Sequence, residues 1–178
     1  MNGLMMNQQL SISSIVEHAE RVNGEVEIVS VTADNPRHRY TYRDAFQRTR
    51  QLANSIADWG LAQGDRIATL AWNDYRHLEV YFGTASMGLV CHTINPRLFP
   101  EQIGYIAGHA EDTVLFFDIN LAPLVEKLAP LLKTVKAYVA MTGRATMPKA
   151  NIPNLHCYEQ LIEAQDDTFE WPSFDEKT

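Results

Sequence analysis

The stretch "AWNDYRHLEVYFGTASMGLVCHTINPRL", residues 71–98, decides the fold class. It opens with an Asn-Asp pair that can start a helix, and apolar side chains then recur at helical spacing up to Gly88, a residue typical of helix ends. The apolar segment "LVCHT" predicts a strand, which Asn95-Pro96-Arg97 ends abruptly. With "GDRIATLA" just before it, the stretch predicts one strand–helix–strand unit. Asn73 is the expected N-cap of the helix, whose expected inner face carries Leu78, Tyr81, Phe82 and Ala85.

The same rhythm continues along the chain. Predicted strands begin near Arg66, Leu89, Thr113 and Lys136, and amphipathic helices lie between them. Apolar strands that alternate with helices form right-handed crossovers and a parallel sheet covered on both faces. We therefore predict an α/β fold with an open, doubly wound, mainly parallel sheet flanked by helices.

Three parts are expected along the chain. Residues 1–40 predict an α+β arm, in which a helix precedes a hairpin formed by "EVEIVSVT" and "RYTY". Residues 41–142 predict the α/β core, which starts with a helix whose Thr41 and Asp44 resemble a capping box. Residues 143–178 predict a loop, a short helix and a polar tail that leads to a downstream part.

Composition and charge limit the classes of function. The 178 residues carry a formal net charge of −7, and 46% of them are hydrophobic, which is typical of a globular domain. This charge argues against a nucleic-acid partner, because such binding depends on clustered Lys and Arg. Cys91 and Cys157 fit two unpaired thiols in a reducing cytoplasm. The N-terminus lacks the pattern of a signal peptide, and no apolar run reaches the roughly 18 residues of a membrane span, so a cytoplasmic chain is expected.

One loop offers a candidate cofactor-binding residue. Ligands of open parallel sheets bind at the carboxyl ends of the strands, yet no following loop contains a glycine-rich phosphate-binding motif. In the loop after "LVCHT", Arg97 could lie next to an anionic group of a cofactor. The alternative is that Asn95-Pro96-Arg97 serves only as a backbone turn.

The other candidate residues favour structural roles. His109, Glu111 and Asp112 form the only local cluster of possible metal ligands, but a histidine near a helix end beside solvated acids explains it, so no metal site is predicted. Cys91 lies in the middle of a predicted buried strand and fits a small core residue better than a nucleophile. The residues alone therefore identify no catalytic group.

Several motifs nevertheless occur in a recognisable order between Thr41 and Asp118. They are TYRD at the start of a helix, GLAQGDRIA, a helix that begins at Asn and ends at Gly, INPRL and HAED. This order resembles the N-terminal part of the AMP-forming acyl-CoA synthetases, whose adenylate-forming fold agrees with the predicted sheet. Within the family, the sequence of this region most resembles that of the medium- and long-chain fatty acid ligases. Methylmercaptopropionyl-CoA ligases are similar in the same region.

The resemblance implies an activity and its cofactors. In this family a carboxylate attacks ATP to give an acyl-adenylate and pyrophosphate, and the thiol of coenzyme A then displaces AMP. ATP, Mg²⁺ and coenzyme A are thus the implied cofactors of the full-length enzyme, and a medium- to long-chain fatty acid or a related carboxylic acid is its implied substrate. The family's phosphate loop, Mg²⁺-binding Thr-Glu pair, ribose-binding Asp and catalytic Lys are not found in the 178 residues. We therefore expect an N-terminal fragment that is inactive alone, binds no cofactor and contains no catalytic residue.

Two alternatives of other classes stay open. The chain could be a free-standing α/β domain for interaction or dimerisation, or a nucleotide-binding regulatory domain, although the latter would need a phosphate-binding loop. The tail "FEWPSFDEKT" favours the fragment, because it contains no closing element. Resemblance also implies a homodimer, with the arm at residues 11–22 in the contact.

Overall fold

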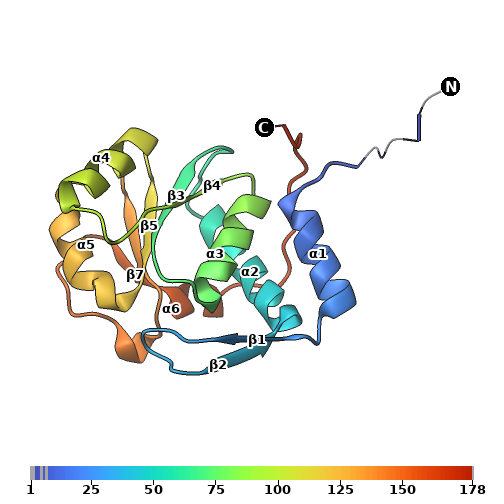
Figure 1. The fold of residues 1–178 in the computed structure, drawn as a ribbon, viewed down its shortest axis with the longest axis horizontal. Helices are drawn as coiled ribbons and strands as arrows, with labels where there is room; N and C mark the ends of the chain where they lie inside the picture. The colour runs from blue at the N-terminus through green and yellow to red at the C-terminus, as the bar shows by residue number, and fades with distance from the viewer. Residues whose placement is uncertain (1–2, 5, 7, 178) are drawn as a thin grey trace.

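Five parallel strands form the central sheet of the computed structural model, which describes residues 3–4, 6 and 8–177 (Figure 1). The strand order is β4-β3-β5-β6-β7, so the chain runs from β3 to one side and then returns to the other side of it. Open sheets bind ligands near such a reversal, at the carboxyl ends of the strands. The strands are β3 (Arg66–Leu70), β4 (Val90–Thr93), β5 (Val114–Phe117), β6 (Ala137–Ala140) and β7 (Leu155–Cys157).

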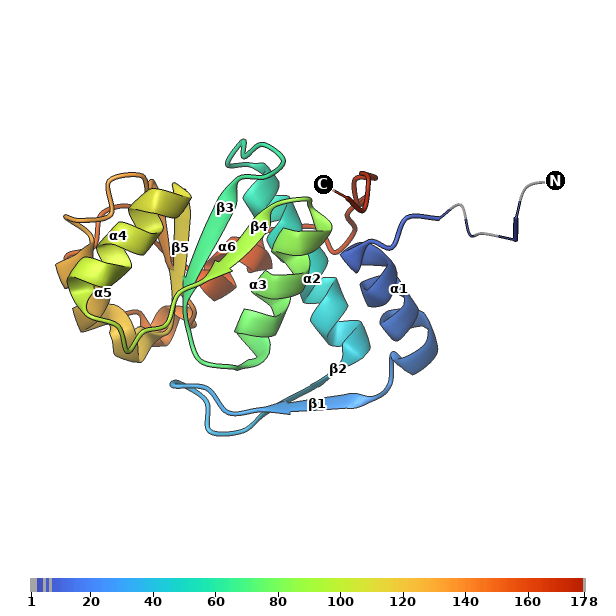
Figure 2. The same ribbon diagram turned by 45° about the horizontal axis from the view of Figure 1, so that its top comes forward.

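Helices cover both faces of this sheet. On one face, Leu52, Val80 and Tyr158 of three helices pack in one apolar cluster with Phe116 of the sheet. On the other face, α4 and α5 pack in a second cluster with Leu115 and its neighbours, as Figures 1 and 2 show from two directions. The doubly wound α/β prediction is thus confirmed. The helices are α2 (Tyr42–Ala57), α3 (Tyr75–Ser86) and α6 (Tyr158–Glu163) on the first face, and α4 (Pro100–Ala110) and α5 (Ala122–Leu128) on the second.

The central strands agree with the sequence, and the edges differ. All residues of β5 and β6 are buried, as their uninterrupted apolar character predicts. Between β5 and β6 the chain forms a short 3-10 turn, η1 (Ile119–Leu121), followed by α5. We expected a loop where β7 pairs with β6, because three residues are too few to establish a strand periodicity. Cys91 lies half-buried on β4, an edge strand, and not in a fully buried strand as predicted.

Helix α3 corrects two predictions. Asp74, and not Asn73, is its N-cap, and the Asp74 carboxylate accepts a hydrogen bond from the His77 backbone N–H at 3.0 Å. The predicted inner face is also wrong, since Tyr81 is exposed and Leu78, Phe82 and Ala85 are only half-buried. The buried side instead carries Tyr75, Arg76, His77, Glu79, Val80, Gly83, Thr84 and Ser86. A polar inner face is stable here because its charged groups are paired, as described below.

The arm, the hairpin and the tail surround α2 and α3. Strands β1 (Glu27–Ser30) and β2 (His38–Thr41) form the predicted antiparallel hairpin, and the predicted capping box of Thr41 and Asp44 opens α2. Helix α1 (Ile12–Asn23) packs against α2 and α3. The tail crosses α2, where Asn54 donates to the carbonyls of Asp166 and Thr168 at 2.8 Å. Glu176 then accepts from the Leu10 N–H at 2.7 Å, which places the tail beside the arm. In the described part of the chain, no helix is long and apolar enough to cross a membrane.

Candidate functional site

A hollow of about 360 Å³ lies at the carboxyl ends of β3 and β4. It is formed where the loop after β3 faces the loop after β4, the position at which an open parallel sheet is expected to bind a ligand. Aromatic, amide and cationic side chains line it together, which suits a ligand with both an aromatic and an anionic part. Its lining residues are Ala71, Trp72, Asn73, His77, Tyr81, Thr93, Ile94, Asn95, Pro96 and Arg97.

Arg97, the predicted cofactor-binding residue, lies on the wall of this hollow. Its backbone N–H donates to Asn95 Oδ1 at 3.0 Å, so the turn that the sequence predicted is present. Its guanidinium lies 6.0 Å from the centroid of the Trp72 ring, and the Arg97 side chain is exposed. The turn and the exposed cation therefore coexist, because the Asn95 side chain stabilises the backbone and leaves the guanidinium available.

The loop after β3 is held by two residues that follow β5. The Trp72 N–H donates to Asp118 Oδ2 at 2.6 Å, and the Trp72 indole N–H donates to Asn120 Oδ1 at 3.3 Å. Asp118 is buried, and burial raises its pKa to about 6. These two bonds hold the Trp72 ring at the mouth of the hollow, so this wall is largely preformed.

His77 forms the floor beside Trp72. Its Nδ1 lies 3.0 Å from the Trp72 carbonyl and its Nε2 lies 3.0 Å from Thr69 Oγ1. Burial lowers the pKa of His77. Both ring nitrogens are therefore engaged by the protein, and the histidine braces the loop and is not free to bind a ligand.

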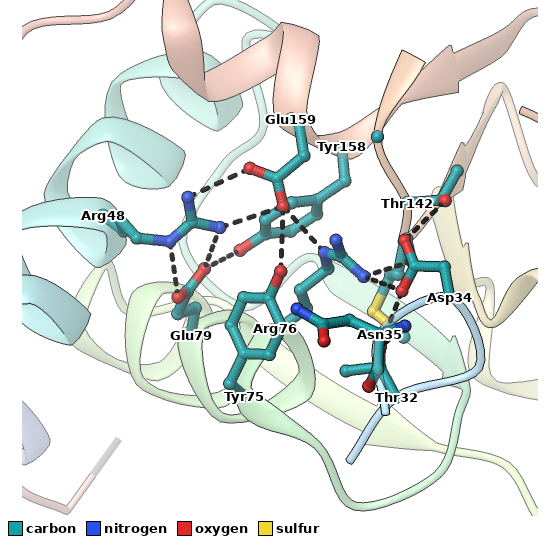
Figure 3. A network of polar contacts seen from close by, with 12 residues as sticks. Thr32, Asp34, Asn35, Arg48, Tyr75, Arg76, Glu79, Thr142, Tyr158 and Glu159 are labelled. Carbon is teal, nitrogen blue, oxygen red and sulfur yellow. Dashed lines mark hydrogen bonds and ion pairs between the residues drawn. The ribbon is translucent and has the colours of Figure 1, made fainter. Parts of the chain in front are cut away.

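Ion pairs shown in Figure 3 connect the hairpin with α2, α3 and α6, and we call this set the buried ion cluster: Asp34, Arg48, Arg76, Glu79 and Glu159. Glu79 is fully buried and binds Arg48 through two hydrogen bonds of 2.8 and 3.2 Å. The Tyr158 hydroxyl donates to Glu79 Oε2 at 2.6 Å. Burial raises the pKa of Glu79, although Arg48 and Tyr158 oppose that shift.

Arg76 connects the other half of the buried ion cluster to the sheet. It donates to Asp34 Oδ1 at 2.9 Å, to Glu159 Oε1 at 2.8 Å and to the Met141 carbonyl at 3.0 Å. Burial alone would raise the pKa of Asp34, but its hydrogen bonds to Arg76, Thr32 and Thr142 lower the pKa below its ordinary value. Asp34 comes from the hairpin, so this pair ties the hairpin to the sheet.

The loop after β6 is held by the same contacts. Thr142 Oγ1 donates to Asp34 Oδ2 at 2.8 Å, and the Thr142 carbonyl accepts from the Cys157 thiol at 3.2 Å and from the Glu159 N–H at 3.3 Å. This loop is therefore rigid at its start, whereas the loop that carries Arg97 is exposed. Sequence reasoning missed the buried ion cluster, and the only signal for it was a set of charged residues at inward positions of α2 and α3.

The local acid–histidine cluster of the sequence is not a joint site. His109 stacks on Tyr105, with ring centroids 5.8 Å apart, while Glu111 pairs with Arg66 and Asp112 pairs with His92. Within residues 3–4, 6 and 8–177, no group of three His, Cys, Asp or Glu side chains could hold a metal ion. Burial raises the pKa of Cys91 to about 12, so its thiol stays protonated at neutral pH and is a poor nucleophile.

Comparisons with known proteins agree on one family. The family model of AMP-binding enzymes matches residues 16–167. A 3-methylmercaptopropionyl-CoA ligase of Ruegeria lacuscaerulensis is 48% identical over 178 residues, which are 100% of this chain and 33% of that protein. A medium-chain-fatty-acid–CoA ligase of Ectopseudomonas oleovorans is 45% identical over 99% of this chain and 32% of its own length. The chain thus spans about a third of the length of these relatives.

A solved structure shows the same fold. The anthranilate CoA ligase AuaEII, in complex with anthranoyl-AMP, superposes with a TM-score of 0.79 over 97% of this chain and 31% of that chain, at 20% identity. At this identity the likeness concerns the fold alone. The parallel sheet and its flanking helices are therefore those of the N-terminal part of an adenylate-forming ligase.

Proposed function

The chain belongs to the AMP-binding enzyme family, within the AMP-forming acyl-CoA ligases, and from this premise we propose that it is the N-terminal portion of an ATP-dependent acyl-CoA ligase. The proposed enzyme joins a medium- to long-chain fatty acid, or a related carboxylic acid, to AMP and then transfers the acyl group to coenzyme A. The observation that carries the proposal is the 45–48% identity to named acyl-CoA ligases over almost the whole chain.

In this proposal the chain contributes a scaffold and one wall of a cofactor site. ATP, Mg²⁺ and coenzyme A are the proposed cofactors of the complete gene product. We propose no Mg²⁺ ligand among the described residues. Arg97 is proposed to contact an anionic group of ATP or coenzyme A. Its exposed guanidinium beside the Trp72 ring supports this, because adenine nucleotides combine a flat base with phosphates.

We expect the complete gene product to release pyrophosphate from ATP only when a carboxylic acid is present. The acid is the nucleophile that displaces pyrophosphate, so its omission should remove the product. A pyrophosphate assay with acids from short to long chain, followed by thioester formation with coenzyme A, measures both steps. Absence of acid-dependent release with every acid would contradict the ligase proposal, and dimerisation without activity would favour a free-standing interaction module.

The 178-residue chain alone should bind Mg-ATP only weakly. The carboxyl edge offers scattered arginines but no glycine-rich loop of convergent backbone amides, which is what phosphate-binding loops supply. Calorimetric titration should therefore detect no one-to-one complex tighter than about 1 mM, equivalent to about −4 kcal/mol. A tighter complex would place a nucleotide site in the chain that this proposal lacks.

The remaining organisation is part of the same proposal. We propose that residues 1–40, 41–142 and 143–178 act as arm, core and connecting tail, and that the protein works as a homodimer in the cytoplasm. Exposed apolar residues on α1 support the dimer, since Ile12, Ile15 and Val22 lie 38%, 55% and 59% exposed.

A further inference from the structure

The tripeptide Asn-Pro-Arg occurs twice in the chain, and both copies make the same hydrogen bond between the asparagine side chain and the arginine backbone. The Arg97 N–H donates to Asn95 Oδ1 at 3.0 Å, and the Arg37 N–H donates to Asn35 Oδ1 at 3.0 Å. The copy at residues 95–97 follows β4 of the sheet, and the copy at residues 35–37 lies between the hairpin strands β1 and β2. In each turn the asparagine stabilises the backbone and the arginine is exposed.

Both turns lie at the carboxyl edge of the sheet. The Asn95 turn follows β4 directly, and Asp34, next to Asn35, binds Thr142 in the loop after β6 (Figure 3). Figure 2 shows the hairpin running along the side of the molecule to which the carboxyl ends of β3 and β4 point. Three strand steps separate β4 from β6, which at about 4.8 Å per step is about 14 Å.

Three exposed arginines of this edge pair with no carboxylate of the described residues. The chain contains ten arginines, and six of them form the ion pairs of Arg39, Arg43, Arg48, Arg50, Arg66 and Arg76. Of the four that pair with no carboxylate among the described residues, three belong to this edge: Arg37, Arg97 and Arg144. With the Gln160 amide turned so that its carbonyl faces Arg144, that guanidinium donates to it at 2.8 and 3.0 Å.

This distribution differs from the charge of the whole chain, which is −7. Acids near the edge are already engaged, since Asp34 and Glu159 bind arginines of the buried ion cluster and Asp118 accepts from Trp72. Guanidiniums without a carboxylate partner on structured turns, in an otherwise acidic chain, favour the binding of phosphate, which arginine contacts through two parallel hydrogen bonds.

We propose that Arg37 and Arg144 form a second phosphate contact, which acts together with Arg97 to hold one nucleotide that carries several phosphate groups along the carboxyl edge. The aromatic ring of Trp72 lies beside Arg97 and suits the base of such a nucleotide. The inference deepens the proposed function, on which it rests for the nature of the ligand, by assigning a binding role to the hairpin.

Titration of the 178-residue chain with tripolyphosphate and with adenosine 3',5'-bisphosphate, followed by amide chemical shifts in NMR, tests this inference. We expect weak binding, on the order of millimolar, with shifts at residues 35–37, 95–97 and 143–146. Arg37→Ala, Arg97→Ala and Arg144→Ala should each weaken binding about threefold, and the Arg37→Ala/Arg97→Ala pair about tenfold. Adenosine without phosphate should shift the Trp72 region alone.

Arg39→Ala is the matched control, because it removes the same charge two residues from Arg37 in the same hairpin. Unlike Arg37, Arg39 is paired with Glu27. Arg39→Ala should change binding less than twofold. The absence of chemical-shift changes at the two turns would overturn the inference. An equal loss of affinity in Arg39→Ala would also overturn it, because it would indicate nonspecific electrostatic attraction. No turnover is needed in this experiment, so its failure is distinct from a failure of the ligase assay.

Discussion

Replacing Glu79 by alanine should lower the free energy of unfolding of the chain by about 3 kcal/mol, the low end of the roughly 3–5 kcal/mol lost when one partner of a buried ion pair is removed. The Glu79 side chain is fully buried, and its loss removes the acceptor of two Arg48 hydrogen bonds and of the Tyr158 hydroxyl. Arg48 keeps Glu159 at 3.0 Å, which is why the low end is expected. Urea unfolding measures the change, and a slope of about 2 kcal/mol per molar would move the midpoint by about 1.5 M.

The control is an ion pair at the surface. Glu25 pairs with Arg43 at 2.8 Å, but the Glu25 side chain is 82% exposed, so Glu25→Ala should leave the midpoint unchanged within error. Equal effects of the two substitutions would show that Glu79 is not held as described. Replacing both Arg48 by Met and Glu79 by Leu should restore much of the stability, because neither charge is then buried alone.

The helices α2 and α3 show what the sequence could predict. In α2 the apolar residues form one continuous stripe, and Thr41 with Asp44 marks its start, so both its position and most of its inner face were predictable. In α3 the charged residues Arg76 and Glu79 point inward, and apolar periodicity alone placed them outside. Their partners come from the hairpin, α2 and α6, at sequence separations from 31 to 83 residues, and no local pattern contains that information.

The candidate site divides in the same way. The position of Arg97 at the carboxyl edge was predictable because its turn is local and follows a strand, and its cofactor contact stays a prediction. The approach of Trp72 and Tyr81 to it depends on how two loops pack, which the sequence does not specify. The role suggested for Arg37 also depends on packing, since contacts of Asp34 with Thr142 and Arg76, which are distant in the sequence, bring the hairpin to this edge.

Ile15→Asp should convert a proposed homodimer of the chain into monomers at tens of micromolar. Ile12, Ile15, Ala19 and Val22 lie on one side of α1, because steps of three, four and three residues keep to one helix face. The neighbouring side of α1 is anchored, with Val16 fully buried and Glu20 bound to Arg50 at 2.7 Å. The exposed stripe is therefore available for a second copy, and an aspartate at its centre would bury an unpaired charge in the contact.

Light scattering combined with size-exclusion chromatography measures this change as a halving of the mass. Arg21→Asp is a suitable control, because Arg21 is exposed on the same helix but lies about 120° around it from Ile15. It adds more negative charge than Ile15→Asp does, so a dimer that survives Arg21→Asp and not Ile15→Asp depends on the apolar stripe and not on net charge. A wild-type chain that is monomeric at this concentration would refute the dimer. The exposed apolar stripe of α1 would then not be a contact between two copies of this chain.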